Sequence, residues 1–120
     1  MINFRQLNVG KRAKAWAELS HSLHYEKFNI ALIQEPSRKN TKISPELKNG
    51  LTFYKETNQA PRACIYIDKT TAKDTNAILL SQFSDSDHTT VHLKIVDKNK
   101  KRNDLIIWRV IWCSLSQLAM

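Results

Sequence analysis

The stretch NIALIQEP, from Asn29 to Pro36, decides the fold class. It is a short and nearly continuous apolar run that stops at Glu35 and Pro36. Runs of this kind are typical of strands that are buried on both faces of a sheet. The run therefore predicts a central strand over 29–34.

The residues before this strand predict a helix and a second strand. Apolar and polar residues alternate over 2–9, which indicates a strand, and Gly10 ends it. From about Arg12 to Lys27 the apolar residues recur at helical spacing, which predicts an amphipathic helix. Strand, helix and strand in this order indicate a crossover that joins two parallel strands, and hence an α/β fold.

Short strands follow the central one. The polar stretch 37–49 is expected to be a loop, 68–76 is also polar, and 97–104 is expected to be a charged turn. Strands are predicted over 51–55, 62–67, 77–83 and 89–96, with another from 105. This part of the chain is expected to form a meander.

Composition limits the function classes. The 120 residues fit one domain, and 19 Lys plus Arg against 11 Asp plus Glu give a net charge of +8. This charge favours anionic partners, with nucleic acid first and an anionic membrane second. The two cysteines, Cys64 and Cys113, suffice neither for a disulfide framework nor for a zinc site. With no signal-peptide pattern and no membrane-length apolar run, we expect an intracellular protein, nuclear or cytoplasmic and not secreted.

Two polar residues end the two predicted parallel strands. Asn8 closes the first and Glu35 the second, so both are expected at the same edge of the sheet. A carboxylate suits Mg²⁺, and an amide can contact a phosphate oxygen or a water. This pair could form part of a site for metal-assisted phosphodiester hydrolysis. Alternatively, Asn8 caps a turn and Glu35 ends a strand in solvent.

The order of these motifs resembles the start of the endonuclease/exonuclease/phosphatase family. The segments are LNVG at 7–10, a helix with early Ala and Trp, IQEP at 33–36 and PRACIYI at 61–67. The nearest likeness is to the endonuclease domain of non-LTR retrotransposons, and it covers roughly residues 1–107. The resemblance implies an αββα two-sheet sandwich, of which this chain would hold a part: the first sheet, the first helix and the meander.

The resemblance also implies roles for individual residues. Glu35 would bind a divalent metal, Mg²⁺ or Mn²⁺, weakly if at all, and Asn8 would help to orient metal and phosphate. Lys11, Arg12 and Arg62 are candidate contacts to the nucleic-acid backbone, and no small-molecule cofactor is implied. DNA is the expected partner, and a membrane is not.

The sequence departs from the family pattern after Ile107. The family continues with a Tyr, an Asp-x-Asn pair and a terminal Ser-Asp-His, whereas residues 108–120 form a divergent apolar tail. We therefore expect the N-terminal part of a Mg²⁺-dependent DNA endonuclease that is inactive alone. The alternatives are a non-enzymatic basic nucleic-acid binder, or a phosphoesterase of the same family that acts on phospholipids or small substrates.

Two further patterns are interpreted as structural and not as catalytic or metal-binding. Ser86-Asp87-His88 spells the terminal triad of the family, but it lies in a loop and is interpreted as a turn. His21 and His24 are interpreted as residues of a solvated helix face.

If the second half of the sandwich is absent, apolar faces of the strands would stay uncovered, and self-association through them is expected.

Overall fold

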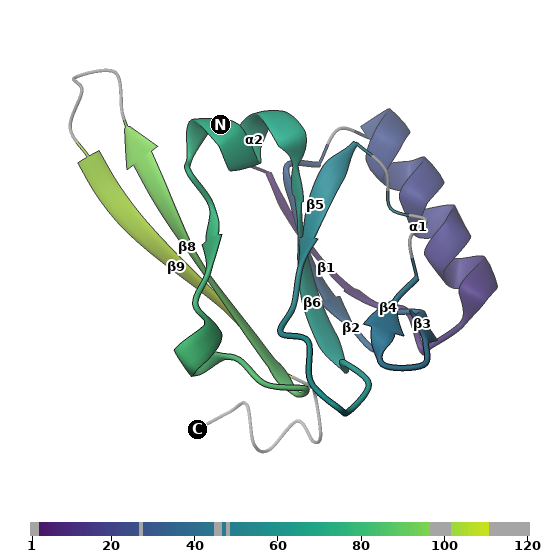
Figure 1. The fold of residues 1–120 in the computed structure, drawn as a ribbon. Helices are drawn as coiled ribbons and strands as arrows, with labels where there is room; N and C mark the ends of the chain where they lie inside the picture. The colour runs from purple at the N-terminus through teal and green to yellow at the C-terminus, as the bar shows by residue number, and fades with distance from the viewer. Residues whose placement is uncertain (1–2, 27, 45–46, 48, 97–101, 111–120) are drawn as a thin grey trace, which may run out of the picture.

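The computed structural model describes residues 3–26, 28–44, 47, 49–96 and 102–110. The fold is α/β, as predicted, and Figure 1 shows a helix, a four-stranded sheet and a three-stranded sheet lying side by side. None of the helices within the described ranges is both long and apolar enough to span a membrane.

The four-stranded sheet carries the predicted crossover. Its strand order is β1-β2-β6-β5, with β1 at Phe4–Asn8, β2 at Ile30–Gln34, β6 at Ala63–Asp68 and β5 at Gly50–Phe53. Strands β1 and β2 are parallel, and helix α1 (Ala13–Glu26) connects them. The other two pairings are antiparallel, so the sheet is mixed.

Helix α1 covers one face of this sheet (Figure 1). Trp16 is fully buried there, and its indole Nε1 donates a hydrogen bond of 3.1 Å to the Ser44 carbonyl. The apolar face of α1 packs on the alternate residues of β2 and β6 that point toward it. The buried members of this cluster are Val9, Trp16, Leu19, Leu23, Ala31, Ile33, Leu47, Cys64 and Tyr66. Burial raises the pKa of the free Cys64 thiol, which therefore stays protonated and unreactive.

The opposite face of the sheet is covered by a second, three-stranded sheet of order β7-β8-β9. Its strands are β7 at Ile78–Leu79, β8 at His88–Val96 and β9 at Arg102–Val110. The cluster between the two sheets contains Ile30, Ile65, Ile67, Ala72, Val91, Leu93 and Ile107. Strand β2 is thus buried on both faces, as its apolar run predicted.

The expectation of uncovered strand faces was wrong for β6 and for the inner face of β8. Ile65 and Ile67 of β6 are 0% exposed, as are Val91 and Leu93 of β8, because the two strands lie in different sheets that pack on each other. On the outer face of the three-stranded sheet, Ile106 is 61% exposed, whereas Thr90 is buried.

One element was not predicted, and three local predictions were wrong. The polar stretch after β6 contains helix α2 (Lys69–Asp74), whose N-cap Asp68 accepts the Thr71 N–H at 2.7 Å. The strand predicted over 77–83 is only β7, followed by a 3-10 turn at Ser81–Phe83. The loop 37–49 contains a small hairpin of β3 (Arg38–Lys39) and β4 (Lys42–Ile43). Strand β9 begins within the predicted turn and continues through residue 110; residues 111–120 lie outside the described ranges.

Candidate active site

The predicted edge of the sheet is assembled from the ends of β1, β2 and β6. Asn8 pairs with Gln34, so Glu35 follows β2 at the edge where β1 ends. The Glu35 carbonyl accepts from the Lys11 N–H at 2.9 Å, and the Glu35 N–H donates to the Arg62 carbonyl at 2.9 Å. The structure therefore brings Asn8, Lys11, Glu35 and Arg62 together at one edge.

Asn8 shapes the turn that follows β1. Its side-chain Oδ1 accepts the Gly10 N–H at 2.9 Å, and Gly10 and Lys11 both adopt positive φ, at 66° and 63°. The alternative interpretation of Asn8 as a turn cap is therefore correct as far as its contacts go. The residue is nevertheless exposed at this edge of the sheet.

Glu35 lies at the centre of a charged cluster. Its carboxylate is 3.7 Å from Lys11 Nζ and 3.5 Å from an Arg62 guanidinium nitrogen, and its side chain is 16% exposed. Within the described ranges, no group hydrogen-bonds the buried Oε2 atom. The backbone of Glu35 is also in the left-handed region, with φ of 53°. Because its carboxylate is largely buried and lies near two cations, Glu35 does not simply end a strand in solvent.

Arg62 contacts both Glu35 and Asp87, a residue that the sequence alone indicates to be part of a turn. Its second terminal nitrogen is 3.6 Å from Asp87 Oδ1, so the guanidinium lies between two carboxylates. Asp87 belongs to the Ser86-Asp87-His88 motif. The structure places Ser86 and Asp87 in a turn and His88 at the start of β8, and this turn lies beside the edge. The contact joins β6 to a turn that leads into the other sheet, and no spacing in the sequence indicates it.

Arg12 is at the same turn but is oriented differently. Its Nε donates to the Val9 carbonyl at 3.4 Å, so the guanidinium folds back on its own loop. Arg38 of β3 likewise donates to the Pro61 carbonyl at 3.1 Å. Both remain cations near the edge, while Lys11 and Arg62 are the two that contact Glu35.

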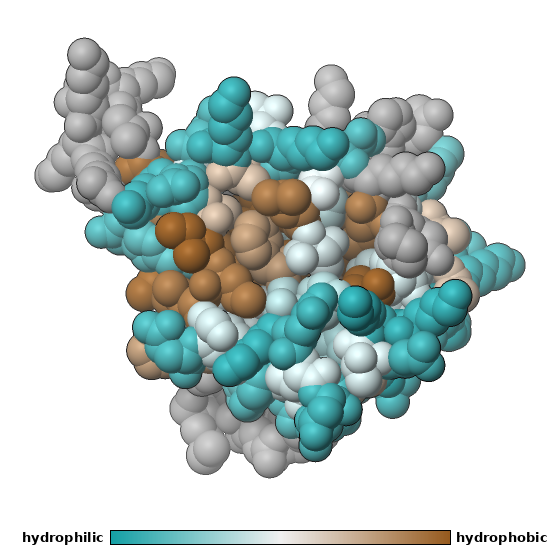
Figure 2. All heavy atoms as spheres, viewed as in Figure 1, coloured by the Kyte–Doolittle hydropathy of each residue, from teal (hydrophilic) through white to brown (hydrophobic). Residues whose placement is uncertain are grey.

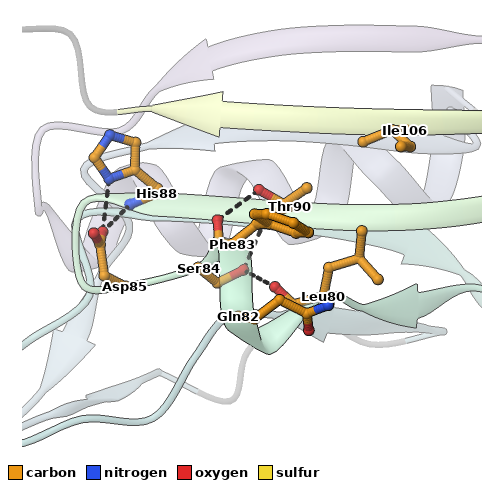
Figure 3. Close-up of a pocket in the computed structure, with 8 residues that line it drawn as sticks. All are labelled: Leu80, Gln82, Phe83, Ser84, Asp85, His88, Thr90 and Ile106. Atoms are coloured by element: carbon orange, nitrogen blue, oxygen red, sulfur yellow. Dashed lines mark hydrogen bonds and ion pairs between the residues drawn. The ribbon is translucent and has the colours of Figure 1, made fainter.

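A separate hollow of about 530 Å³ lies on the outer face of the three-stranded sheet. Figure 3 shows Asp85 and His88 facing each other at one end of it, with Ile106 further along the sheet. Partial desolvation raises the pKa of Asp85. The His88 side chain, the amides of Asp87 and His88 and the charge of His88 act against this, and together they leave that pKa lowered. Glu35 does not line this hollow.

The residues at the edge fit a weakly held divalent cation. The described part of the chain contains no group of three or more acidic, His or Cys side chains that could enclose a metal ion. Mg²⁺, however, is commonly held by one or two carboxylates together with waters and substrate phosphates. Glu35 supplies one such carboxylate; its Oε2 atom has no hydrogen-bond partner within the described ranges but is buried beside Lys11 Nζ, so a cation there would have to displace the Lys11 side chain.

The comparisons with known proteins support the resemblance at the level of the fold. No protein-family model matches the chain, and no curated protein matches it significantly. Among solved structures, it is similar to the endonuclease domain of TRAS1, a telomere-specific non-LTR retrotransposon, with a TM-score of 0.68 and 19% identity. The match covers 89% of this chain and 44% of that chain, so this chain spans less than half of that domain. This chain therefore has the fold of the corresponding part of a retrotransposon endonuclease domain.

Proposed function

We propose that the edge formed by Asn8, Lys11, Glu35 and Arg62 is part of a Mg²⁺-dependent site that cleaves phosphodiester bonds of DNA. The observation that carries the proposal is Glu35, a largely buried carboxylate in a left-handed backbone position, at the carboxyl end of a central strand. The shared fold with an endonuclease domain supports it. We also infer that the layers form part of an αββα sandwich.

Each residue at this edge has a role that follows from its chemistry. Glu35, with help from Asn8, would hold Mg²⁺ (or Mn²⁺), which when bound stabilises negative charge on the scissile phosphate. The side-chain amide of Asn8 can donate to a phosphate oxygen. Lys11 and Arg62 have side chains that are 53% and 43% exposed, so both can exchange their contact with Glu35 for one with a phosphate.

DNA is the proposed partner because the contacts available at this edge are mainly cationic. Arg12 adds a third exposed cation to Lys11 and Arg62, and the whole chain carries a net charge of +8. Such contacts recognise the sugar–phosphate backbone without reading its sequence. We further propose that this edge alone does not hydrolyse DNA, since this chain covers only 44% of the similar endonuclease chain.

The salt dependence of DNA affinity tests the proposed contact. We expect Lys11→Gln to lower the slope of log affinity against log salt by about 1, because one phosphate contact is lost. Lys69→Gln is the matched control, since Lys69 is an exposed cation beyond the other end of β6. Fluorescence anisotropy with a short labelled duplex measures both variants. Equal slopes for the two would contradict a role of this edge in DNA binding.

The metal is tested separately with Glu35→Gln. Mn²⁺ should broaden the amide resonances around Asn8 and Glu35 in the wild type but not in this variant, and excess Mg²⁺ should reverse the broadening. Neither protein is expected to nick supercoiled DNA. Nicking that depends on Glu35 would show that the chain carries a sufficient site, and identical broadening in the two proteins would exclude Glu35 as a ligand.

The same experiments separate the two alternatives. A non-enzymatic nucleic-acid binder would show the Lys11 effect on DNA affinity without any Mn²⁺ effect at Glu35. A phosphoesterase for phospholipids or small substrates would bind a phosphoinositide headgroup at this edge in preference to duplex DNA.

Self-association is proposed through the outer face of the three-stranded sheet. Phe83 and Ile106 are 62% and 61% exposed and line the same hollow. Figure 2 shows apolar surface gathered over this side of the molecule. Ile106→Lys is expected to shift sedimentation-velocity profiles toward the monomer, whereas Leu51→Lys, at a residue 48% exposed on β5, should not. Profiles that respond equally to both substitutions would place the contact elsewhere.

A further inference from the structure

We propose that Asp87 is a positioning residue that holds the Arg62 guanidinium in place for phosphate binding at the Glu35 edge. The inference rests on the proposed function of that edge and adds to it a residue from the turn before β8.

The turn is fixed by hydrogen bonds within itself. One carboxylate oxygen of Asp85 accepts the Asp87 N–H and the His88 N–H, both at 2.8 Å, and lies 2.7 Å from His88 Nδ1. The Asp85 N–H donates to the His88 carbonyl at 2.9 Å. Four bonds over four residues leave the backbone at Asp87 little freedom.

The turn is also attached to the segment that carries Arg62. The Arg62 N–H donates to the Ser86 carbonyl at 2.7 Å, and the Ser86 hydroxyl donates to Gln59 Oε1 at 3.0 Å. The Arg62 carbonyl in turn accepts from the Glu35 N–H. The backbone of Arg62 is therefore held between the end of β2 and the turn that presents Asp87.

Asp87 is needed to hold the Arg62 guanidinium when the charge of Glu35 is neutralised. In the structure the guanidinium has two carboxylate partners, at 3.5 Å and 3.6 Å. A divalent cation on Glu35 would cancel the charge that attracts Arg62 and would repel it. Asp87 would then be the carboxylate that keeps the guanidinium beside the edge, with its exposed side available to a phosphate.

The sign of the effect on DNA affinity distinguishes positioning from simple charge. Asp87→Asn removes a negative charge close to a bound phosphate, so charge alone would tighten binding. If Asp87 positions Arg62, affinity should instead fall about 3- to 10-fold, because DNA must now order a free arginine side chain. Asp74→Asn is the matched control, an exposed acid in α2 beyond the other end of β6. Asp87→Glu should restore part of the loss.

A second readout does not depend on DNA. The terminal nitrogen resonances of Arg62 should report slow guanidinium rotation in the wild type and faster rotation in Asp87→Asn. The effect of Asp87→Asn should be larger in the Glu35→Gln background, where Arg62 has lost its other carboxylate partner. Unchanged rotation, or tighter DNA binding by Asp87→Asn, would overturn the proposal. If Arg62→Gln leaves DNA affinity unchanged while rotation responds to Asp87, then the ion pair exists and the proposed DNA contact of Arg62 is what fails.

Discussion

Replacing Trp16 with alanine is expected to lower the free energy of unfolding by about 3–5 kcal/mol. The side chain is 0% exposed at the centre of the cluster between α1 and the four-stranded sheet. Its removal leaves a large cavity and also leaves the buried Ser44 carbonyl without its indole donor. Urea unfolding followed by circular dichroism measures the loss.

Two controls separate the parts of this effect. Trp16→Phe keeps most of the apolar volume but loses the hydrogen bond, so it should cost less than Trp16→Ala. Lys14→Ala, at an exposed position of the same helix, is expected to change stability by less than about 0.5 kcal/mol. A small effect of Trp16→Ala would mean that α1 does not pack on the sheet as the structure shows.

Periodicity was sufficient to predict the layer to which Trp16 belongs. Helix α1 was predicted over 12–27 and lies at Ala13–Glu26, and the strand predicted over 29–34 is β2 at Ile30–Gln34. These elements are long or strongly apolar, and each repeats its pattern over several residues. The parallel pairing of β1 with β2 then followed from the helix between them, and with it the shared edge of Asn8 and Glu35.

The second sheet could not be predicted in the same way. The apolar run of β6 and the alternating residues of β8 show that each strand is buried on at least one face, but they do not show whether the two strands pair or pack face to face. Here they pack, and Thr89 Oγ1 of β8 donates a buried hydrogen bond of 3.0 Å to the Ala63 carbonyl of β6. Only the three-dimensional arrangement distinguishes these two solutions.

The same limit applies to the candidate site. Asn8 and Glu35 were found because each ends a strand, and Lys11 and Arg62 because they match motifs beside those strands. Asp87 is assigned to a turn because Ser, Asp and His are common in loops between strands. Its contact with Arg62 could not be predicted, because Arg62 is distant in sequence and precedes a strand of the other sheet. A contact between two sheets leaves no periodic signal in a single sequence.

Replacing Leu93 with alanine tests the packing of the two sheets, with an expected loss of about 2–5 kcal/mol in the free energy of unfolding. Leu93 is 0% exposed and lies in the cluster formed by both sheets. Truncation would remove apolar contacts on β6 as well as within β8 and β9, and the close-packed surroundings can collapse only partly. Denaturant unfolding at low protein concentration, to limit self-association, gives the value.

Ile106→Ala is the matched control, because it removes a similar apolar side chain from the opposite face of the same pair of strands. Ile106 is 61% exposed, whereas its neighbour Ile107 is 6% exposed and faces the core, as the alternation of β9 requires. The control should cost less than about 0.5 kcal/mol, as surface substitutions usually do. Equal losses for Leu93→Ala and Ile106→Ala would show that both faces of the three-stranded sheet are covered in solution. A negligible loss for both would show that this sheet does not pack on β6, and the turn carrying Asp87 would then lose its support beside Arg62.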